Sequence, residues 1–349
     1  MSFPAPVKSF VPVFLSAALA IAAPMAAADS QTLRIGDFFS TEHLFTQKGT
    51  NPWMEIVQQK TDGTIRFSHF PSSQAAPANG LLDAVSSGVL DMALIGPAYH
   101  SEQLLLNSLI ALPGLYDSAE EGSAALQAMM TEGSLREEFL SAGVVPIFSL
   151  VSPPYQVLLK DNQVGLPDDW RGLDIRTSGT TQAMTTRALG ASSISLPGPE
   201  VYMGIERGRI EGVLFPISSI GAYNLQEVVK HISSNGSFGG YSYVLVINQQ
   251  LFERLSEEQR AAMLEAGEEI SMQLAKALDD STEELLDEWR NQGLNIFQFS
   301  DEELQALDNA MDDVKGDWVQ RISSHNPDAA ATLDAFENSV SNVSLNGNI

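Results

Sequence analysis

The 349-residue sequence contains no cysteine, which excludes disulfides, thiolate chemistry, cysteine-rich metal sites and a lipoprotein-type cysteine anchor. Basic residues are also scarce: 19 Lys and Arg stand against 44 Asp and Glu, a formal net charge of −25. Phosphate binding needs clustered Lys and Arg, and no basic stripe is present, so the sequence argues against a nucleic-acid partner. The acidic balance favours solubility and keeps the chain away from anionic membranes.

Catalytic signatures are missing as well. The sequence has no P-loop, no G-x-G-x-x-G, no H-E-x-x-H and no G-x-S-x-G. Its five histidines are far apart and show no metal-ligand spacing, and its paired acidic residues lie in polar, helical settings typical of solvated faces. The sequence therefore predicts no enzyme, no cofactor and no metal site.

The N-terminus has the pattern of a signal peptide. Lys8 is the only charged side chain before Asp29, an apolar run follows from Phe10, and Ala26–Ala28 offers an A-x-A cleavage site. The apolar run, 10–23, is shorter than the roughly 20 residues that span a bilayer. We therefore expect cleavage after residue 28 and no stable membrane insertion; the alternative is an uncleaved membrane anchor.

Apolar strands alternate with helices along the chain, which indicates an α/β fold with a mainly parallel sheet covered on both faces. In the first half, strands are expected at 32–35, 65–70, 92–95 and 144–150, and helices at 52–60, 79–87 and 117–142, the last broken near Gly133. Further strands are expected at 156–159, 173–175 and 241–247.

Two groups of helix- and strand-breaking residues suggest that the chain crosses between lobes more than once. These are Ser152–Pro154 and Gly239–Gly240. Beyond them, Ser256 opens the longest helix, with Gln259 at capping-box spacing, and Gly293 ends it. A helix of about 36 residues is roughly 54 Å long, more than one small lobe needs. The alternative is two helices in line, with a break near residues 279–280.

Arg176 is the main candidate for binding chemistry. It follows the short strand Leu173–Ile175, at the edge of an open α/β sheet where ligands bind. The next residues, Thr177–Thr181, begin a helix whose amide end also favours anions. A guanidinium pairs with both oxygens of a carboxylate. Because the protein is acidic overall, such binding would depend on a local, partly desolvated arginine; the alternative role is a salt bridge to a nearby acidic residue.

Six segments of the sequence form a pattern in their order and spacing: GLDIR (172–176), FPSSQ (70–74), DAVSSGVLD (83–91), LPGL (112–115), ALGASSISLP (188–197) and PEVYMGIERGRIEGVLFP (199–216). With these segments the sequence resembles the periplasmic substrate-binding proteins of TRAP transporters over nearly all of the expected mature chain. In that family the arginine of the first segment grips the carboxylate of the ligand. The resemblance gives this role to Arg176.

The resemblance also implies the architecture. We expect a two-lobed periplasmic-binding-protein fold of the α/β class, with mixed, mainly parallel sheets and a long helix crossing both lobes. Lobe I would comprise 29–152 plus about 240–279, and lobe II about 153–239 plus 280–340. The tail, 341–349, is rich in Ser, Asn and Gly and is expected to be disordered.

Departures from the family pattern predict an apolar or aromatic pocket. Many members have Asn where this chain has Phe215, and others have a second arginine where Tyr155 and Gln156 stand. Tyr99 would wall the same cleft from the first lobe, and His43 falls where family members line it. The predicted ligand-binding residues are Arg176, Phe215, Tyr155, Tyr99, His43 and Gln74. The alternatives are core packing for the three aromatic residues and an exposed helix start for His43.

The function implied by the resemblance is that of a periplasmic solute-binding protein. It would capture a small organic acid anion in an interlobe cleft and deliver it to TRAP transporter membrane subunits, with no cofactor. One alternative is a receptor that presents its ligand to a membrane sensor kinase, which neighbouring genes would reveal. A periplasmic enzyme on the same fold is a second alternative. The departures at 155 and 215 leave the identity of the acid open.

Overall fold

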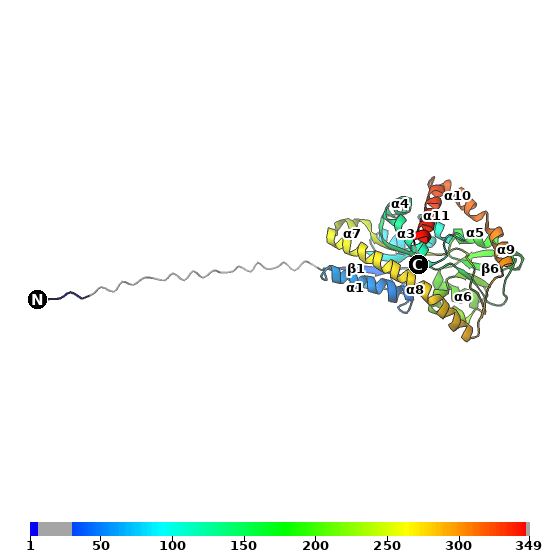
Figure 1. Cartoon of the computed structure of the whole chain (residues 1–349), viewed down its shortest axis with the longest axis horizontal. Coiled ribbons are helices and arrows are strands. Elements are labelled where there is room, and N and C mark those ends of the chain that lie inside the picture. Colours follow the sequence, from blue (N-terminus) through cyan, green and yellow to red (C-terminus); the bar gives the residue numbers. More distant parts are fainter. Residues whose placement is uncertain (6–29, 347–349) are drawn as a thin grey trace.

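The computed structural model describes residues 1–5 and 30–346 and has two lobes, each built on its own β-sheet (Figure 1). The expected signal peptide, 1–28, lies outside the described residues apart from 1–5. Among the helices of the described residues, none combines the length and the apolar character that a membrane crossing requires.

The first lobe contains a five-stranded sheet in the order β2-β1-β3-β10-β4. Strands β1 and β2, and β1 and β3, run parallel, whereas β10 is antiparallel to both of its neighbours. The strands are β1 (Gln31–Gly36), β2 (Ile65–Phe70), β3 (Met92–Ile95), β4 (Val144–Val151) and β10 (Ser242–Asn248). The helices that follow them in the chain are α1 (Asn51–Lys60), α2 (Leu81–Ser86), α3 (Ala119–Thr131), α4 (Ser134–Ser141) and α7 (Gln249–Arg254). As predicted, the 117–142 helical region is interrupted at Gly133, whose φ of 103° favours glycine.

The second lobe contains a six-stranded sheet in the order β11-β9-β5-β8-β6-β7. Its strands are β5 (Gln156–Leu159), β6 (Asp174–Thr177), β7 (Ser192–Ser195), β8 (Gly212–Phe215), β9 (His231–Ser233) and β11 (Asn295–Phe297). Strand β6 is parallel to both neighbours and β5 antiparallel to both, so this sheet is mixed too. Its helices are α5 (Thr180–Ala188), α6 (Val201–Glu206), α9 (Asp301–Met311) and α10 (Val314–Ser323). The predicted two-lobed α/β class is confirmed.

Short helical turns occupy most of the remaining connections. They are η1 (Phe45–Thr50), η2 (Ala78–Gly80), η3 (Pro97–His100), η4 (Leu106–Ala111), η5 (Pro167–Trp170), η6 (Gly198–Glu200), η7 (Ile217–Ser219), η8 (Gly221–Tyr223) and η9 (Leu225–Glu227). Several of them follow directly on the ends of strands, among them η3 after β3 and η7 after β8.

The predicted breaks coincide with two of the passages between the sheets. Ser152–Pro154 connects β4 to β5, and Gly239–Gly240 connects β9 to β10. The two passages are hydrogen bonded side by side, because Tyr155 N donates to Gly239 O at 2.8 Å. Gly239 has φ 92°, and a Cβ there would lie 2.3 Å from Ala111 O, so only glycine fits this turn.

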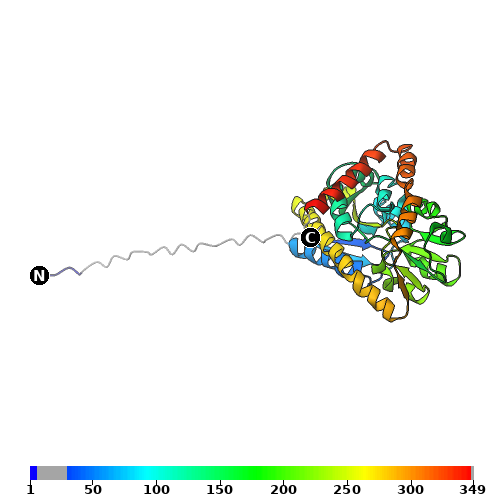
Figure 2. The same cartoon turned by 45° about the vertical axis from the view of Figure 1, so that its right-hand side comes forward.

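Helix α8 (Glu257–Asn291) is one continuous helix that runs along both lobes (Figure 2). Ser256 and Gln259 form the predicted capping box at its start. In the first lobe, Trp53 Nε1 donates to Met263 O at 3.1 Å. Near its other end, Trp289 packs in the apolar cluster on one face of the second sheet. The prediction of a long helix crossing both lobes is confirmed, and the expected alternative of a break near 279–280 is not observed.

Asp279, in the middle of α8, caps helix α3. Its two carboxylate oxygens accept the backbone N–H groups of Ala119 and Glu120, each at 2.9 Å. Asp279→Ala is therefore expected to lower the free energy of unfolding by about 1–2 kcal/mol, measured by chemical denaturation, because two donors of the first turn lose their acceptor. The neighbouring Asp280→Ala removes only an exposed pair with Lys276 and serves as the control. Equal losses in the two variants would contradict the capping role.

The C-terminal region differs from the expectation. Residues 341–346 continue helix α11 (Ala329–Asn346), so the prediction of disorder is wrong for them; 347–349 lie outside the described residues. The helix packs beside α3 of the first lobe, although 280–340 was assigned to the second (Figure 1). Apolar residues at helical spacing, Leu333 and Phe336, are buried, and this outweighs the polar composition of the last residues.

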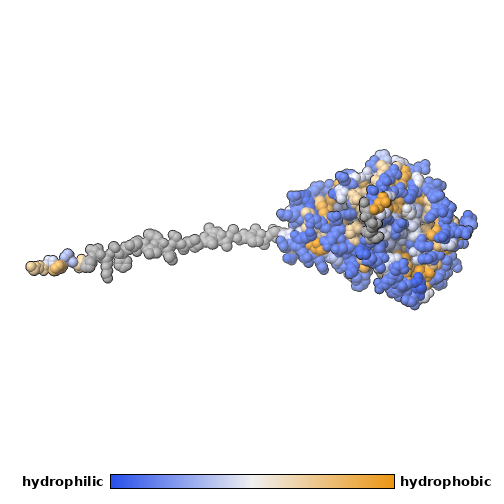
Figure 3. Space-filling model, in the orientation of Figure 1, coloured by the Kyte–Doolittle hydropathy of each residue, from blue (hydrophilic) through white to orange (hydrophobic). Residues whose placement is uncertain are grey.

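The molecular surface is mainly hydrophilic on the face shown in Figure 3, with small separate hydrophobic patches. This agrees with the large excess of acidic residues, and it places most of the apolar side chains in the two interior clusters.

Candidate functional site

Arg176 lies at the carboxyl end of β6 and is 1% exposed. Its Nε donates to Leu196 O at 2.8 Å and its Nη1 approaches Leu214 O at 3.5 Å. Both acceptors are backbone oxygens of neighbouring segments of the second lobe, the end of β7 and strand β8. These backbone oxygens, which carry no net charge, therefore hold the guanidinium in place at the carboxyl end of β6.

The third contact of the guanidinium crosses to the first lobe. Arg176 Nη2 donates to Tyr99 Oη at 3.4 Å, and the same hydroxyl accepts the backbone N–H of Gly198 at 2.9 Å. Tyr99 lies on η3, directly after β3. The two lobes thus meet at this hydroxyl.

No carboxylate pairs with Arg176 among the described residues. The alternative role considered for this residue, a salt bridge to a nearby Asp or Glu, is therefore not what the structure shows. A buried charge is costly unless it is paired or well hydrogen bonded. The arrangement is one that an anion would complete, because the guanidinium has more donors than its three contacts use.

Phe215 and Tyr155 form an aromatic wall beside the guanidinium. Arg176 Cζ lies 5.4 Å from the centroid of the Phe215 ring, a cation–π distance. The Tyr155 ring centroid is 6.2 Å from that of Phe215, and both residues are buried. Burial raises the pKa of the Tyr155 hydroxyl, against the opposing effect of Arg176, so the group stays neutral.

His43 belongs to the same set of rings. Its ring centroid lies 5.7 Å from that of Tyr223, which in turn is 5.6 Å from Phe215. Burial lowers the pKa of His43 to about 3, which makes the imidazole neutral at ordinary pH. The structure places His43 in the interior, so it is not the exposed helix-start residue of the alternative interpretation.

Gln74 is the predicted site residue that the structure leaves apart from this cluster. Its side chain is exposed and makes no hydrogen bond to the residues that the structure describes. The reason lies in the preceding turn, where Ser72 and Ser73 adopt φ of 56° and 57°. Ser72 N donates to Phe39 O at 2.6 Å, so the backbone of this turn, and not the Gln74 side chain, faces the loop that carries Phe39.

Several aromatic residues of the cluster were not singled out from the sequence. They are Phe38, Phe39, Tyr223, Tyr241 and Tyr243. Tyr241 directly precedes β10 and Tyr243 is its second residue; they are two residues apart in extended backbone, so their side chains share a face, and their ring centroids are 4.9 Å apart. That alternation in the predicted strand 241–247 was the available signal. Phe38 and Tyr223 lie in connections and carry no such pattern.

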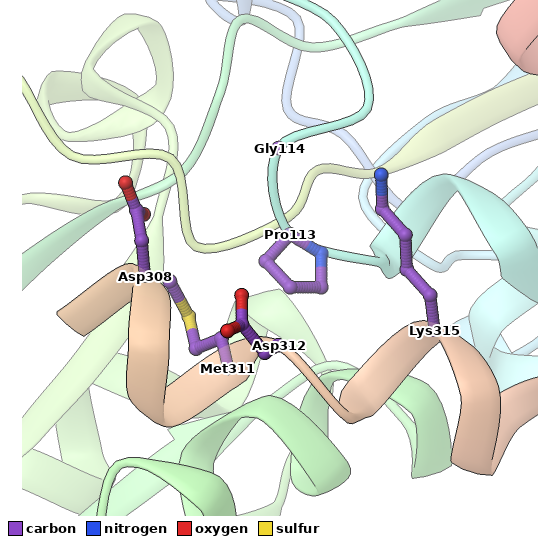
Figure 4. A pocket seen from close by; sticks show the side chains of 6 residues that line it. All are labelled: Pro113, Gly114, Asp308, Met311, Asp312 and Lys315. Atoms are coloured by element: carbon purple, nitrogen blue, oxygen red, sulfur yellow. The ribbon is translucent and has the colours of Figure 1, made fainter. Parts of the chain in front are cut away.

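A crevice of about 400 Å³ opens beside Tyr99, between the two lobes. Ala98 and Tyr99 line it from the first lobe, and Thr177–Thr180 and Pro197 line it from the second. A different surface pocket, of about 320 Å³, lies between the Pro113–Gly114 turn and helices α9 and α10 (Figure 4). Its charged side chains are Asp308, Asp312 and Lys315, and it contains none of the predicted site residues. Two carboxylates there oppose the binding of an anion.

Two α/β lobes joined by paired crossings, with a buried guanidinium and an aromatic lining where the lobes meet, define the solute-binding class of protein. The profile of the DctP family, bacterial extracellular solute-binding protein family 7, matches residues 37–320. The chain belongs to this family.

Relatives of known structure or name agree with that assignment. The chain is 24% identical over 313 residues to the 2,3-diketo-L-gulonate-binding periplasmic protein YiaO of Escherichia coli, covering 88% of this chain and 93% of that protein. It is similar in fold to a TRAP solute-binding protein of Rhodoferax ferrireducens in complex with copurified benzoate, with a TM-score of 0.85, 21% identity and coverage of 90% and 99%. A marine metagenome protein specific for aromatic acids, with bound 3-hydroxybenzoate, gives a TM-score of 0.84, 20% identity and coverage of 90% and 98%.

Proposed function

We propose that this protein captures a small organic acid anion between its lobes, with Arg176 as the residue that binds the carboxylate. The observation that carries the proposal is the buried guanidinium without an anionic partner among the described residues. A carboxylate would supply the missing negative charge and accept two parallel hydrogen bonds from the planar fork. Binding requires no covalent chemistry.

The lining favours an acid with an aromatic or apolar body. Phe215, Tyr155, Tyr223 and Tyr99 present ring surfaces around the guanidinium, and aromatic rings pair well with one another at centroid separations of about 4.5–7 Å. Structural relatives hold benzoate and 3-hydroxybenzoate, which supports the same class. We therefore take aromatic monocarboxylates as the first candidates.

Membership of the family supports a proposal for the physiological role. We propose export to the periplasm through a cleaved segment, 1–28, and delivery of the bound acid to the membrane subunits of a TRAP transporter. Closure of the lobes about the crossings 152–154 and 239–240 would be the signal that those subunits read. A ligand shifts such an equilibrium only by its differential affinity for the closed state, and Tyr99, which joins the lobes at Arg176, would provide it.

A ligand screen on the mature chain tests the proposal. The protein is unfolded and refolded to remove copurified ligand, and its melting temperature is then measured with benzoate, 3-hydroxybenzoate, cyclohexanecarboxylate and succinate. Benzoate is expected to raise the melting temperature, because ligand at about 100 times Kd adds about 2.7 kcal/mol to the stability of the native state. Benzamide, which has the same ring and no charge, is the control and should have no effect. Absence of a shift with every carboxylate would refute the proposal.

A further inference from the structure

His43 is held in one orientation within the aromatic cluster. Its side chain is 1% exposed, and its ring centroid lies 4.1 Å from that of Phe39 and 5.3 Å from that of Phe45. Tyr223 of the second lobe approaches its edge at 5.7 Å. The imidazole is therefore packed on several sides by rings of both lobes.

The backbone selects the tautomer of His43. Its Nδ1 accepts the N–H of Phe45 at 3.2 Å, so in the neutral ring the proton resides on Nε2. Turning the ring over would leave the buried N–H of Phe45 without an acceptor. The neutral ring consequently presents Nε2–H as a donor.

That donor has no partner among the described residues, although it is fully buried. Buried donors in native proteins nearly always have an acceptor. Leaving a buried donor without one costs more free energy than a typical hydrogen bond contributes to stability. Rings of both lobes surround His43, so a molecule bound between the lobes would be placed to supply the missing acceptor.

We propose that His43 Nε2–H reads a second, uncharged oxygen acceptor on the ligand, so that the substrate class is a monocarboxylate carrying a hydroxyl, ether or carbonyl group on its body. This rests on the proposed function, in which Arg176 takes the carboxylate. His43 then discriminates between acids that share a carboxylate and differ in that group.

The charges around His43 argue for an uncharged acceptor. Among the Lys and Arg residues within 30–346, Arg176 is the one that is buried. A single carboxylate on the ligand would neutralise its charge. The imidazole adds no second positive charge, because burial keeps its pKa at about 3. Asp37 is fully buried on the same loop and is paired with His69, so a second carboxylate on the ligand would meet an acidic side chain and, among the described residues, no second buried Lys or Arg.

The test compares acids of nearly equal shape in wild-type and variant protein by calorimetry. The probes are benzoate, 3-hydroxybenzoate against 3-methylbenzoate, and 4-hydroxybenzoate against 4-methylbenzoate. Wild-type protein is expected to bind the hydroxyl acid about tenfold more tightly than the methyl acid in at least one pair. In His43→Asn, whose amide oxygen can still accept the Phe45 N–H but which cannot reach the ligand, that preference is expected to fall to about twofold or less, whatever the change in the affinity for benzoate itself.

His43→Gln is the companion variant, because its amide N–H reaches about as far as Nε2 and should retain part of the preference. The melting temperature of each ligand-free variant shows whether it is folded. If benzoate binds but the preference is absent in wild-type protein, or survives unchanged in His43→Asn, the role of His43 is overturned while the proposed function stands. If no carboxylate binds, the proposed function fails, and the inference fails with it.

Discussion

Arg176→Met is expected to weaken benzoate binding at least tenfold, and not to lower the melting temperature of the ligand-free protein. Each charge-assisted hydrogen bond to the carboxylate is worth about 1.5–3 kcal/mol, so loss of even one reaches a factor of ten. Stability should not fall, because methionine fills a similar volume and removes a buried charge that has no anionic partner among the described residues. Calorimetry and thermal unfolding measure the two effects separately.

The control is Arg187→Met, on helix α5 near the same crevice. This residue is exposed and its guanidinium contacts Ser193 Oγ at 3.2 Å. The Arg187→Met substitution removes the same charge from the same lobe. An equal loss of affinity in both variants would therefore mean that Arg176 acts only through the overall electrostatic field of the protein. Unchanged benzoate affinity in Arg176→Met would overturn the assignment of the carboxylate site.

Gly179→Val is expected to prevent the lobes from meeting as they do in this structure, and to weaken benzoate binding at least tenfold. Gly179 precedes α5 in the second lobe, and a Cβ there would lie 2.6 Å from Ala98 O on η3 of the first lobe. That oxygen belongs to the backbone and cannot turn away. The backbone at Gly179 is extended (φ 177°), so valine is not strained in the separated lobe and the effect falls on the contact between lobes.

Small-angle X-ray scattering gives the direct measurement. Saturating benzoate is expected to reduce the radius of gyration of wild-type protein and to leave that of Gly179→Val larger. Gly316→Ala is the control, since its Cβ would meet no atom within 4 Å and it lies in the exposed part of α10. It should change neither affinity nor compaction and should slightly stabilise the helix. Normal compaction and affinity in Gly179→Val would show that this contact does not limit closure.

Local patterns predicted most of the individual elements. The capping box at Ser256 and the apolar stripe after it predicted α8, because both depend on residues close in sequence. The breaks at Ser152–Pro154 and Gly239–Gly240 marked the passages between sheets for the same reason. The C-terminal tail was misjudged, because its helix is stabilised by packing against α3, about 200 residues earlier in the chain, and composition carries no record of such a contact.

The candidate site, too, was predicted from the sequence only in part. Sequence placed Arg176 at the end of a strand and, through the family resemblance, proposed a carboxylate for it; these statements need only the local pattern and the motif. The tertiary structure decided that Arg176 is buried without an anionic partner in the described chain, that Tyr99 meets it from the other lobe, and that Gln74 is turned outward. It also decided that the Nε2–H of His43 is left without an acceptor. The contact between Arg176 and Tyr99 joins residues 77 positions apart in the sequence, and desolvation of a charge or a donor depends on all of its neighbours in space.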